Sequence, residues 1–308
     1  MSPNMNILII GGANMDIKCH IEGAVVAGSS NPGHIRLSVG GVGRNIAHNL
    51  ALLGCETHLL TALGDDAHGG MLRNSCAQAG IHLHAQSGLW PTGTYTAILD
   101  ATGDLVIGVA AMQAIDALKP ETLAVALAHL SNVECLVADA NLPEETLLFL
   151  AQWAEHHAVS FVFEPVSVAK CTRILPILGH WPVYLMSPNR AQLDTLTARA
   201  IDSADDLPRA CAALHARGVE NIIVGLGSDG AFWSDGQSSG TVPACAHEII
   251  DATGGGDAAL AAALWALKRG APLPVAAQAG QKAAALTVAC TGSVNPTLSA
   301  DTLKHEVP

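Results

Sequence analysis

The sequence has few aromatic and few charged residues. Of its 308 residues, 4% are aromatic and 14% are charged, whereas 50% are apolar. Such a composition excludes a disordered chain, and the chain is long enough to bury a large core. Because aromatic side chains are rare, we expect this core to consist mainly of Ala, Leu, Val and Ile. The length allows one large domain or two small ones.

Positive charge is also scarce. The 15 Lys and Arg residues face 27 Asp and Glu residues, which gives a net charge of −12. A net-acidic protein gains little from the phosphate backbone of nucleic acid, so we expect no nucleic-acid partner. Small anionic ligands are still compatible with this charge, because backbone amides can hold them.

Several sequence signals are missing altogether. No apolar run reaches the roughly 18 residues of a membrane span, and no basic residues precede the first apolar segment, as they would in a secretory signal. The eight cysteines include no C-x-x-C pair, which disfavours a zinc or redox motif. We therefore expect a cytoplasmic protein with reduced cysteines and no membrane partner. A Walker A segment is absent as well.

Fourteen histidines raise the question of a metal site. His82 and His84 alternate as on one face of a strand, and His156 and His157 are adjacent. Neither pair has a carboxylate or a cysteine nearby at a spacing typical of metal ligands. The sequence therefore favours surface or half-buried histidines over a dedicated metal site.

Short β-branched runs alternate with longer segments of helical periodicity. Strands are expected at Asn6–Ile10, Thr57–Leu63, Cys135–Ala138, Ser160–Phe163, Pro182–Met186 and Asn221–Val224. Helices are expected at Asn45–Leu53, Met71–Ala79, Glu144–His156, Arg190–Leu196, Ala210–Arg217, Asp257–Lys268 and Val275–Ala289. This alternation predicts an α/β fold of three layers (α/β/α), in which helices cover both faces of a mainly parallel sheet.

Two segments interrupt this alternation. Residues 15–40 and 91–112 resemble short strands and turns without helices, and both leave from the ends of predicted core strands. They could pair into a small β-sheet over the carboxyl edge of the main sheet, where open α/β folds bind ligands. We therefore predict a core of residues 1–14, 41–90 and 113–308, and a β lid of residues 15–40 and 91–112.

Three consecutive glycines, Gly254, Gly255 and Gly256, occur in the segment Asp251–Asp257 before a predicted helix. Glycines at a helix N-terminus leave backbone amides accessible, and these amides favour an anion. Asp257 would then lie beside the anion. A carboxylate in this place could accept a hydroxyl proton while the amides hold a phosphoryl group. Alternatively, the segment is only a glycine-rich loop in which Asp257 compensates the helix dipole.

Two further segments could contact a ligand. In Gly40–Asn45, glycines that open a predicted helix would let a ligand approach the backbone, although Asn45 could instead be a simple N-cap. In Gly11–Asp16, Asn14 and Asp16 alternate and could bind the same sugar hydroxyls, although an Asx turn is the alternative.

The segment Gly225–Gly230 matches G-x-G-x-x-G and follows a predicted strand. A dinucleotide site of this type needs a helix to begin there, whereas residues 231–236 have the pattern of a strand and a turn. We therefore disfavour a nicotinamide-dependent dehydrogenase. The alternative that this segment forms a tight strand–turn–strand, whose backbone approaches a nucleotide, is still compatible with the pattern.

Together, these segments resemble the ribokinase-like (pfkB) family of sugar and nucleoside kinases. The matching motifs are N-x-D at Asn14 and Asp16, G-G-x-G-x-N at Gly40–Asn45, S-P-N at Ser187–Asn189, the turn Leu226–Gly227 and D-x-T-G-x-G-D at Asp251–Asp257. They run in this order nearly from end to end. Within the family, the likeness is to the pseudouridine kinases, through Ser30–Ile35, Val137–Asn141, Pro165–Ser167 and Lys170–Cys171.

The resemblance implies a role for each matching residue. The catalytic base would be Asp257, assisted by the amides of Gly254, Gly255 and Gly256. The substrate-binding residues would be Asn14, Asp16, Gly41, Gly43, Arg44, Asn45 and Asn141. ATP would contact Asn189, Gly225, Gly227, Ser228, Gly254 and Gln281, and a monovalent cation such as K⁺ would contact Asp251 and Thr253. Departures from the family pattern are Gln192 in place of Glu and Gly255 in place of Ala.

The implied reaction is the ATP- and Mg²⁺-dependent phosphorylation of the 5′-hydroxyl of a nucleoside, with pseudouridine as the expected substrate. Other nucleosides such as inosine or adenosine, and free sugars such as ribose or fructose, are the alternatives within the family. A sugar-binding protein without activity is the alternative outside it. The family also implies a homodimer that forms through the lid.

Overall fold

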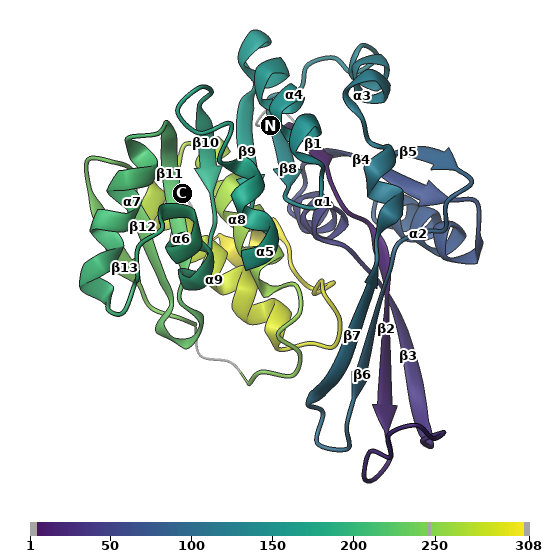
Figure 1. Ribbon diagram of the computed structural model, residues 1–308. Helices are drawn as coiled ribbons and strands as arrows, with labels where there is room; N and C mark the ends of the chain where they lie inside the picture. Colours follow the sequence, from purple (N-terminus) through teal and green to yellow (C-terminus); the bar gives the residue numbers. More distant parts are fainter. Residues whose placement is uncertain (1–4, 246–247, 305–308) are drawn as a thin grey trace.

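The computed structural model describes residues 5–245 and 248–304 (Figure 1). Its main sheet has nine strands, and their bounds in spatial order are β13 (Ser239–Val242), β12 (Ala231–Ser234), β11 (Val219–Gly225), β10 (Val183–Met186), β9 (Ser160–Glu164), β8 (Cys135–Asp139), β1 (Asn6–Ile10), β4 (Glu56–Gly64) and β5 (His82–Gly88). Only the pairs β11–β12 and β12–β13 are antiparallel among the described strands of this sheet. The predicted mainly parallel sheet is confirmed.

Helices cover both faces of this sheet (Figure 1). One face is covered by α3 (Pro120–Leu127), α4 (Glu144–His156), α5 (Val168–Cys171), α6 (Arg190–Thr197) and α7 (Leu207–His215). The other is covered by α1 (Val42–Leu52), α2 (Ala67–Gln78), α8 (Gly255–Lys268), α9 (Leu273–Val288) and α10 (Ala300–Leu303). Short 3₁₀ helices are η1 (Gln113–Ala117), η2 (Thr172–Ile174), η3 (Ala204–Asp206) and η4 (Gly227–Asp229).

Strand β1 shows why the sheet needs cover on both sides. Leu8 and Ile10 point into the core below α3 to α7, whereas Ile7 and Ile9 point into the core below α1, α8 and α9. All four side chains are fully buried. A parallel strand with two buried faces reads as a continuous apolar run, which is what the sequence has here.

The small sheet is built from β3 (Gly33–Gly40), β2 (Asn14–Ile21), β6 (Thr94–Leu99) and β7 (Leu105–Ala111), in that order. It projects from the core as a separate blade (Figure 1). Because β2 begins only four residues after β1 ends, the small sheet starts at the carboxyl edge of the main sheet. We call this four-stranded sheet the lid.

Several element boundaries differ from the sequence-based expectation. Helix α1 begins at Val42 with Gly41 as its N-cap, so the proposal that Asn45 caps the helix is wrong. Helix α8 begins at Gly255, two residues earlier than predicted. Strand β5 and helix α3 were not predicted, because β5 is a polar edge strand and α3 is a single short segment.

The segment after β11 forms η4 and then β12, as the strand–turn pattern indicated, and no α-helix begins there. The dehydrogenase alternative therefore loses the helix on which a dinucleotide site depends. None of the helices in residues 5–245 and 248–304 has the length and hydrophobicity of a membrane-spanning segment.

Candidate active site

The strand order creates a cleft at the carboxyl edge of the main sheet. In the main sheet, β1 lies between β4, the next strand of this sheet along the chain, and β8, which follows later. Open α/β sheets bind ligands where the strand order reverses in this way. A cleft of about 540 Å³ lies here between the core and the lid. The predicted site residues that line it are Asn14, Asp16, Gly41, Asn45, Asn141, Asn189, Gly225, Thr253, Gly254, Gly256, Asp257 and Gln281.

Asp257 lies in the first turn of α8 and lines the cleft although its side chain is almost fully buried. Its Oδ2 accepts a hydrogen bond of 2.8 Å from Nδ2 of Asn45. Burial raises the pKa of Asp257 to about 7, and the charges of Asp139 and Asp16 add to this effect while the Asn45 hydrogen bond opposes it. A carboxylate with such a pKa is suited to exchange protons near neutral pH.

The orientation of Asn45 is fixed by two donors. Its Oδ1 accepts hydrogen bonds from Arg44 Nη1 and from Ser293 Oγ, each at 2.9 Å. The amide nitrogen of Asn45 must therefore face Asp257. Arg44 itself is 3% exposed, also donates to Val39 O and Ser75 Oγ, and does not line the cleft. The structure thus places Arg44 behind Asn45 rather than beside a ligand.

The glycines before Asp257 differ from one another. Gly254 is the N-cap of α8 with a φ of 82°, and a Cβ there would lie 2.0 Å from Ser293 O. A Cβ on Gly256 would meet no atom within 4 Å, and Gly256 lines the cleft. The first amides of α8 have no acceptor within the helix and lie at the positive end of its dipole. This end of the cleft is therefore suited to bind an anion.

Asp251 and Thr253, the predicted ligands of a monovalent cation, lie together, and the ammonium group of Lys18 contacts both side chains. Lys18 Nζ from lid strand β2 lies 2.6 Å from Asp251 Oδ2 and 3.3 Å from Thr253 Oγ1. The other oxygen of Asp251, Oδ1, accepts from Thr253 N at 3.0 Å and from Thr253 Oγ1 at 2.6 Å. Lys18 thus already supplies a positive charge beside Asp251 and Thr253, the predicted ligands of a monovalent cation.

Asp139, at the end of β8, was not predicted from the sequence. Its Oδ2 accepts from the backbone amides of Gly12 at 2.8 Å and Gly43 at 2.9 Å, and its Oδ1 accepts from that of Asn141 at 2.9 Å. One buried carboxylate thus joins the loop after β1, the start of α1 and the loop after β8. Gly43 contributes through this packing and does not line the cleft.

Lys170 and Glu164 also line the cleft. Lys170 Nζ donates to Asn141 Oδ1 at 2.7 Å, and burial lowers the pKa of Lys170. Burial and then the charge of Asp257 raise the pKa of Glu164 well above its usual range, although Val166 N donates to it. Val166 has a φ of 63°, which is strained for a β-branched residue and is typical of functional sites.

Asn189, Gly225 and Gln281 also line the cleft. Asn189 caps α6, and the main chains of Asn189 and Gly225 form an isolated parallel bridge. Gly227 and Ser228 lie in η4 and are not among the residues that line the described cleft.

Comparison with known proteins agrees with this geometry. The family model described as pfkB family carbohydrate kinase matches residues 4–300. The chain belongs to the pfkB family.

Among its relatives, a pseudouridine kinase of Escherichia coli (strain K12) is 32% identical over 95% of this chain and 93% of its own length. The uncharacterized sugar kinase YeiI of the same organism is 34% identical over 98% of this chain and 83% of its own length. A solved carbohydrate kinase from Agrobacterium tumefaciens superposes with a TM-score of 0.85, at 31% identity, and covers 98% of this chain and 96% of its own.

The departures from the pfkB pattern have simple structural consequences. Gln192 Oε1 accepts from Asn189 N at 2.8 Å, and Asn189 Oδ1 accepts from Gln192 N at 2.9 Å. An amide therefore closes this capping box as well as a carboxylate would. A Cβ on Gly255 would lie 2.9 Å from Val288 Cγ1, so the absence of a methyl group relieves a close contact with α9.

Proposed function

We propose that this pfkB kinase transfers the γ-phosphoryl group of ATP to the 5′-hydroxyl of a nucleoside, with pseudouridine as its substrate. The observation that carries this proposal is the buried carboxylate of Asp257, which has a pKa of about 7, accepts a hydrogen bond from Asn45 and lies at the amide-rich start of α8. A proton acceptor beside an anion site is the arrangement that phosphoryl transfer to a hydroxyl needs.

In the proposed reaction, the hydroxyl group gives its proton to Asp257 as its oxygen forms a bond to the γ-phosphorus. The bond between that phosphorus and the β–γ bridging oxygen breaks, and ADP leaves with the electron pair. The amides at the start of α8 stabilise the negative charge on the transferred group. Mg²⁺ bound to the triphosphate would neutralise part of its charge. No step needs a monovalent cation at Asp251.

The nucleoside would lie between the lid and the core. Asn14 Nδ2 donates to Asp16 Oδ1 at 2.7 Å, which leaves Asp16 Oδ2 to accept from a ribose hydroxyl. Lys170 and Asn141 would lie near the base, where the lysine ammonium can donate to a carbonyl oxygen. The 32% identity to a pseudouridine kinase supports this choice of substrate.

The test is ATP consumption by the purified protein with pseudouridine, uridine, inosine or ribose, with Asp257→Asn as the inactive control. Turnover with pseudouridine that is lost in Asp257→Asn supports both the substrate and the base. Turnover with ribose or inosine alone would keep the mechanism and overturn the substrate. Tight nucleoside binding without any turnover would instead support a sugar-binding protein without activity.

A further inference from the structure

A group of histidines and one glutamate lies on the edge of the main sheet. Glu56 and His58 are two residues apart in β4, so both point to the same face of the sheet. The parallel register places His82 of β5 directly beside His58. The sequence could not reveal this group, because the carboxylate is 26 residues from His82 in the chain and reaches it only through strand pairing.

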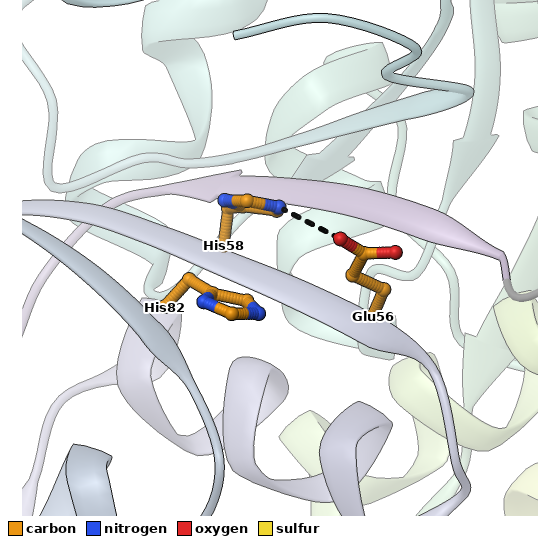
Figure 2. A group of neighbouring side chains, drawn as sticks. All are labelled: Glu56, His58 and His82. Carbon is orange, nitrogen blue, oxygen red and sulfur yellow. Dashed lines mark ion pairs between the residues drawn. The ribbon is translucent and has the colours of Figure 1, made fainter.

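The three side chains are close together. One ligand atom from each of Glu56, His58 and His82 lies within 4.8 Å of the other two. His58 Nε2 is 3.8 Å from Glu56 Oε1, and the rings of His58 and His82 stack with centroids 4.8 Å apart (Figure 2). Binding distances of about 2.1 Å to one zinc ion require a modest further approach. Because His82 is exposed and Glu56 half-buried, both can rotate to make it.

A third histidine, His84, orients His58. His58 Nδ1 lies 3.1 Å from His84 Nε2. With the proton on Nδ1, His58 donates to His84 and keeps the lone pair of Nε2 on the side of Glu56. Metal-binding histidines are oriented in this way by a second hydrogen bond, so His84 is the positioning residue of the group.

The surroundings leave room for an ion and water. A cavity of about 340 Å³ is lined by Glu56 and His58, with His129 and Glu134 also on its wall. It lies near the amino ends of the strands, whereas the active-site cleft lies at their carboxyl ends. An ion here would therefore be distinct from the Mg²⁺ that accompanies ATP.

We propose that Glu56, His58 and His82 bind one divalent transition-metal ion of the zinc type, with water as the remaining ligand. Two imidazoles and one carboxylate are a donor set that zinc prefers, whereas Mg²⁺ prefers oxygen ligands alone. The ion would join edge strand β5 to β4. Its role would be to stabilise this edge of the sheet rather than to take part in phosphoryl transfer.

The test uses the full chain, treated with a chelator and titrated with Zn²⁺ against a chromophoric indicator. We expect one equivalent to bind, a rise in Tm of about 2 °C or more with Zn²⁺, and no comparable response to Mg²⁺. His82→Ala and Glu56→Gln should abolish this equivalent, and His84→Ala should weaken it by about 10- to 100-fold. His20→Ala is the matched control, because His20 stacks on His34 in the lid, away from this group.

Substitution with Co²⁺ gives a second readout that does not depend on stability. Visible absorption bands of a nitrogen–oxygen site should appear with one equivalent of Co²⁺ and be missing in His82→Ala. The proposal would be overturned if wild-type protein bound no Zn²⁺ saturably, or if His82→Ala, Glu56→Gln and His20→Ala all bound as wild type does. Either result would show that these histidines are ordinary surface groups. Kinase activity does not enter this test, so its outcome is independent of the proposed function.

Discussion

At the scale of single residues, Asp257 combines a functional advantage with a cost in stability. Its carboxylate is buried near Asp139 and Asp16, and the same environment that raises its pKa to about 7 makes the charged form unfavourable. Asn45 and Ser293 hold the group in place through successive hydrogen bonds of 2.8 and 2.9 Å. Two predictions follow from this one environment, one for rate and one for stability.

The first prediction concerns the pH dependence of the rate. Only the ionised form of Asp257 can accept a proton, so kcat/KM should rise with pH and level off above about pH 7. Below that pH it should fall about tenfold per pH unit. Steady-state kinetics between pH 5 and 9 would measure this. A flat profile across that range would contradict the assignment of Asp257 as the base.

The second prediction concerns Asp257→Asn. Because the pKa of Asp257 is raised on folding, its contribution to the free energy of unfolding of the wild type is lost as pH rises from about 4 to about 7. Asparagine is uncharged and avoids this loss. We expect the variant to lose at least about 10³-fold in kcat. It should gain roughly 1–4 kcal/mol in stability at pH 8.

Denaturant unfolding of both proteins at pH 8 and pH 4 measures this effect. At pH 4 the wild-type carboxyl is protonated, so the difference in the free energy of unfolding should nearly vanish. An equal difference at both pH values would show that the substitution acts through packing rather than through charge.

The third prediction concerns Lys18, whose ammonium group pairs with Asp251. We expect wild-type activity to be independent of K⁺. Lys18→Met leaves the carboxylate without this partner, so kcat/KM should fall about tenfold in K⁺-free buffer and recover when KCl is added. Kinetics with KCl and with a bulky organic cation chloride at equal ionic strength would check this. Strong K⁺ dependence of the wild type would contradict it.

At the scale of elements, the start of α8 has two glycines that line the cleft, Gly254 and Gly256. Gly254 needs its positive φ and has Ser293 O where a Cβ would lie, whereas Gly256 faces open space in the cleft. Glycine is therefore needed at position 254 for the backbone conformation, whereas at position 256 it leaves space for a ligand.

The fourth prediction compares alanine at these two positions. Gly254→Ala should cost about 2–4 kcal/mol of stability, because it adds strain and a clash with the backbone. Gly256→Ala should leave Tm within about 1 °C and lower kcat by more than about tenfold, because its methyl group would occupy the anion site. Thermal unfolding and kinetics of both variants separate the two effects, and equal losses of stability would contradict the distinction.

At the scale of the whole molecule, the two faces of the lid differ in character. On one face, Ile35, Leu37, Ile107 and Val109 are 68%, 49%, 54% and 56% exposed. The strand register places them in two rows across the sheet, together with Ile17 and Ile98. The opposite face carries Asp16, Tyr95 and Ala110, which line the cleft. An apolar sheet face of this kind usually meets a partner, and we infer that the partner is the lid of a second copy.

The fifth prediction follows from this inference. The 31.6 kDa chain should elute as a dimer in size-exclusion chromatography with light scattering. Ile107→Glu should give a monomer with a higher KM for the nucleoside. Val125→Glu is the control, because Val125 is 65% exposed on helix α3 and outside the lid. A dimer that persists in Ile107→Glu, or a monomeric wild type, would contradict the inference.

The sequence predicted the layers of the fold, because hydrophobic periodicity is a local signal, and most of the site residues expected from its glycine patterns and family motifs line the cleft. It did not predict the roles of Asp139, Lys18 or Ser293, whose importance comes from partners far along the chain. For the same reason it could not separate Arg44 from Asn45. The two residues are adjacent in α1 and belong to the same motif, yet Asn45 lines the cleft and Arg44 is buried behind Asn45.

The hydrogen bond between Asn45 and Asp257 also bears on how the protein folds. Asn45 and Asp257 are 212 positions apart in the sequence. Ser293, which donates a hydrogen bond to Asn45, is 248 positions away from it. Contacts of such long separation form late and slowly, because closing the intervening chain costs entropy that only the finished core repays. The Asn45–Asp257 pair therefore depends on the packing of α8 against α1. A folding intermediate that contains only the first strands and helices would lack this hydrogen-bonded pair and with it the proposed proton acceptor.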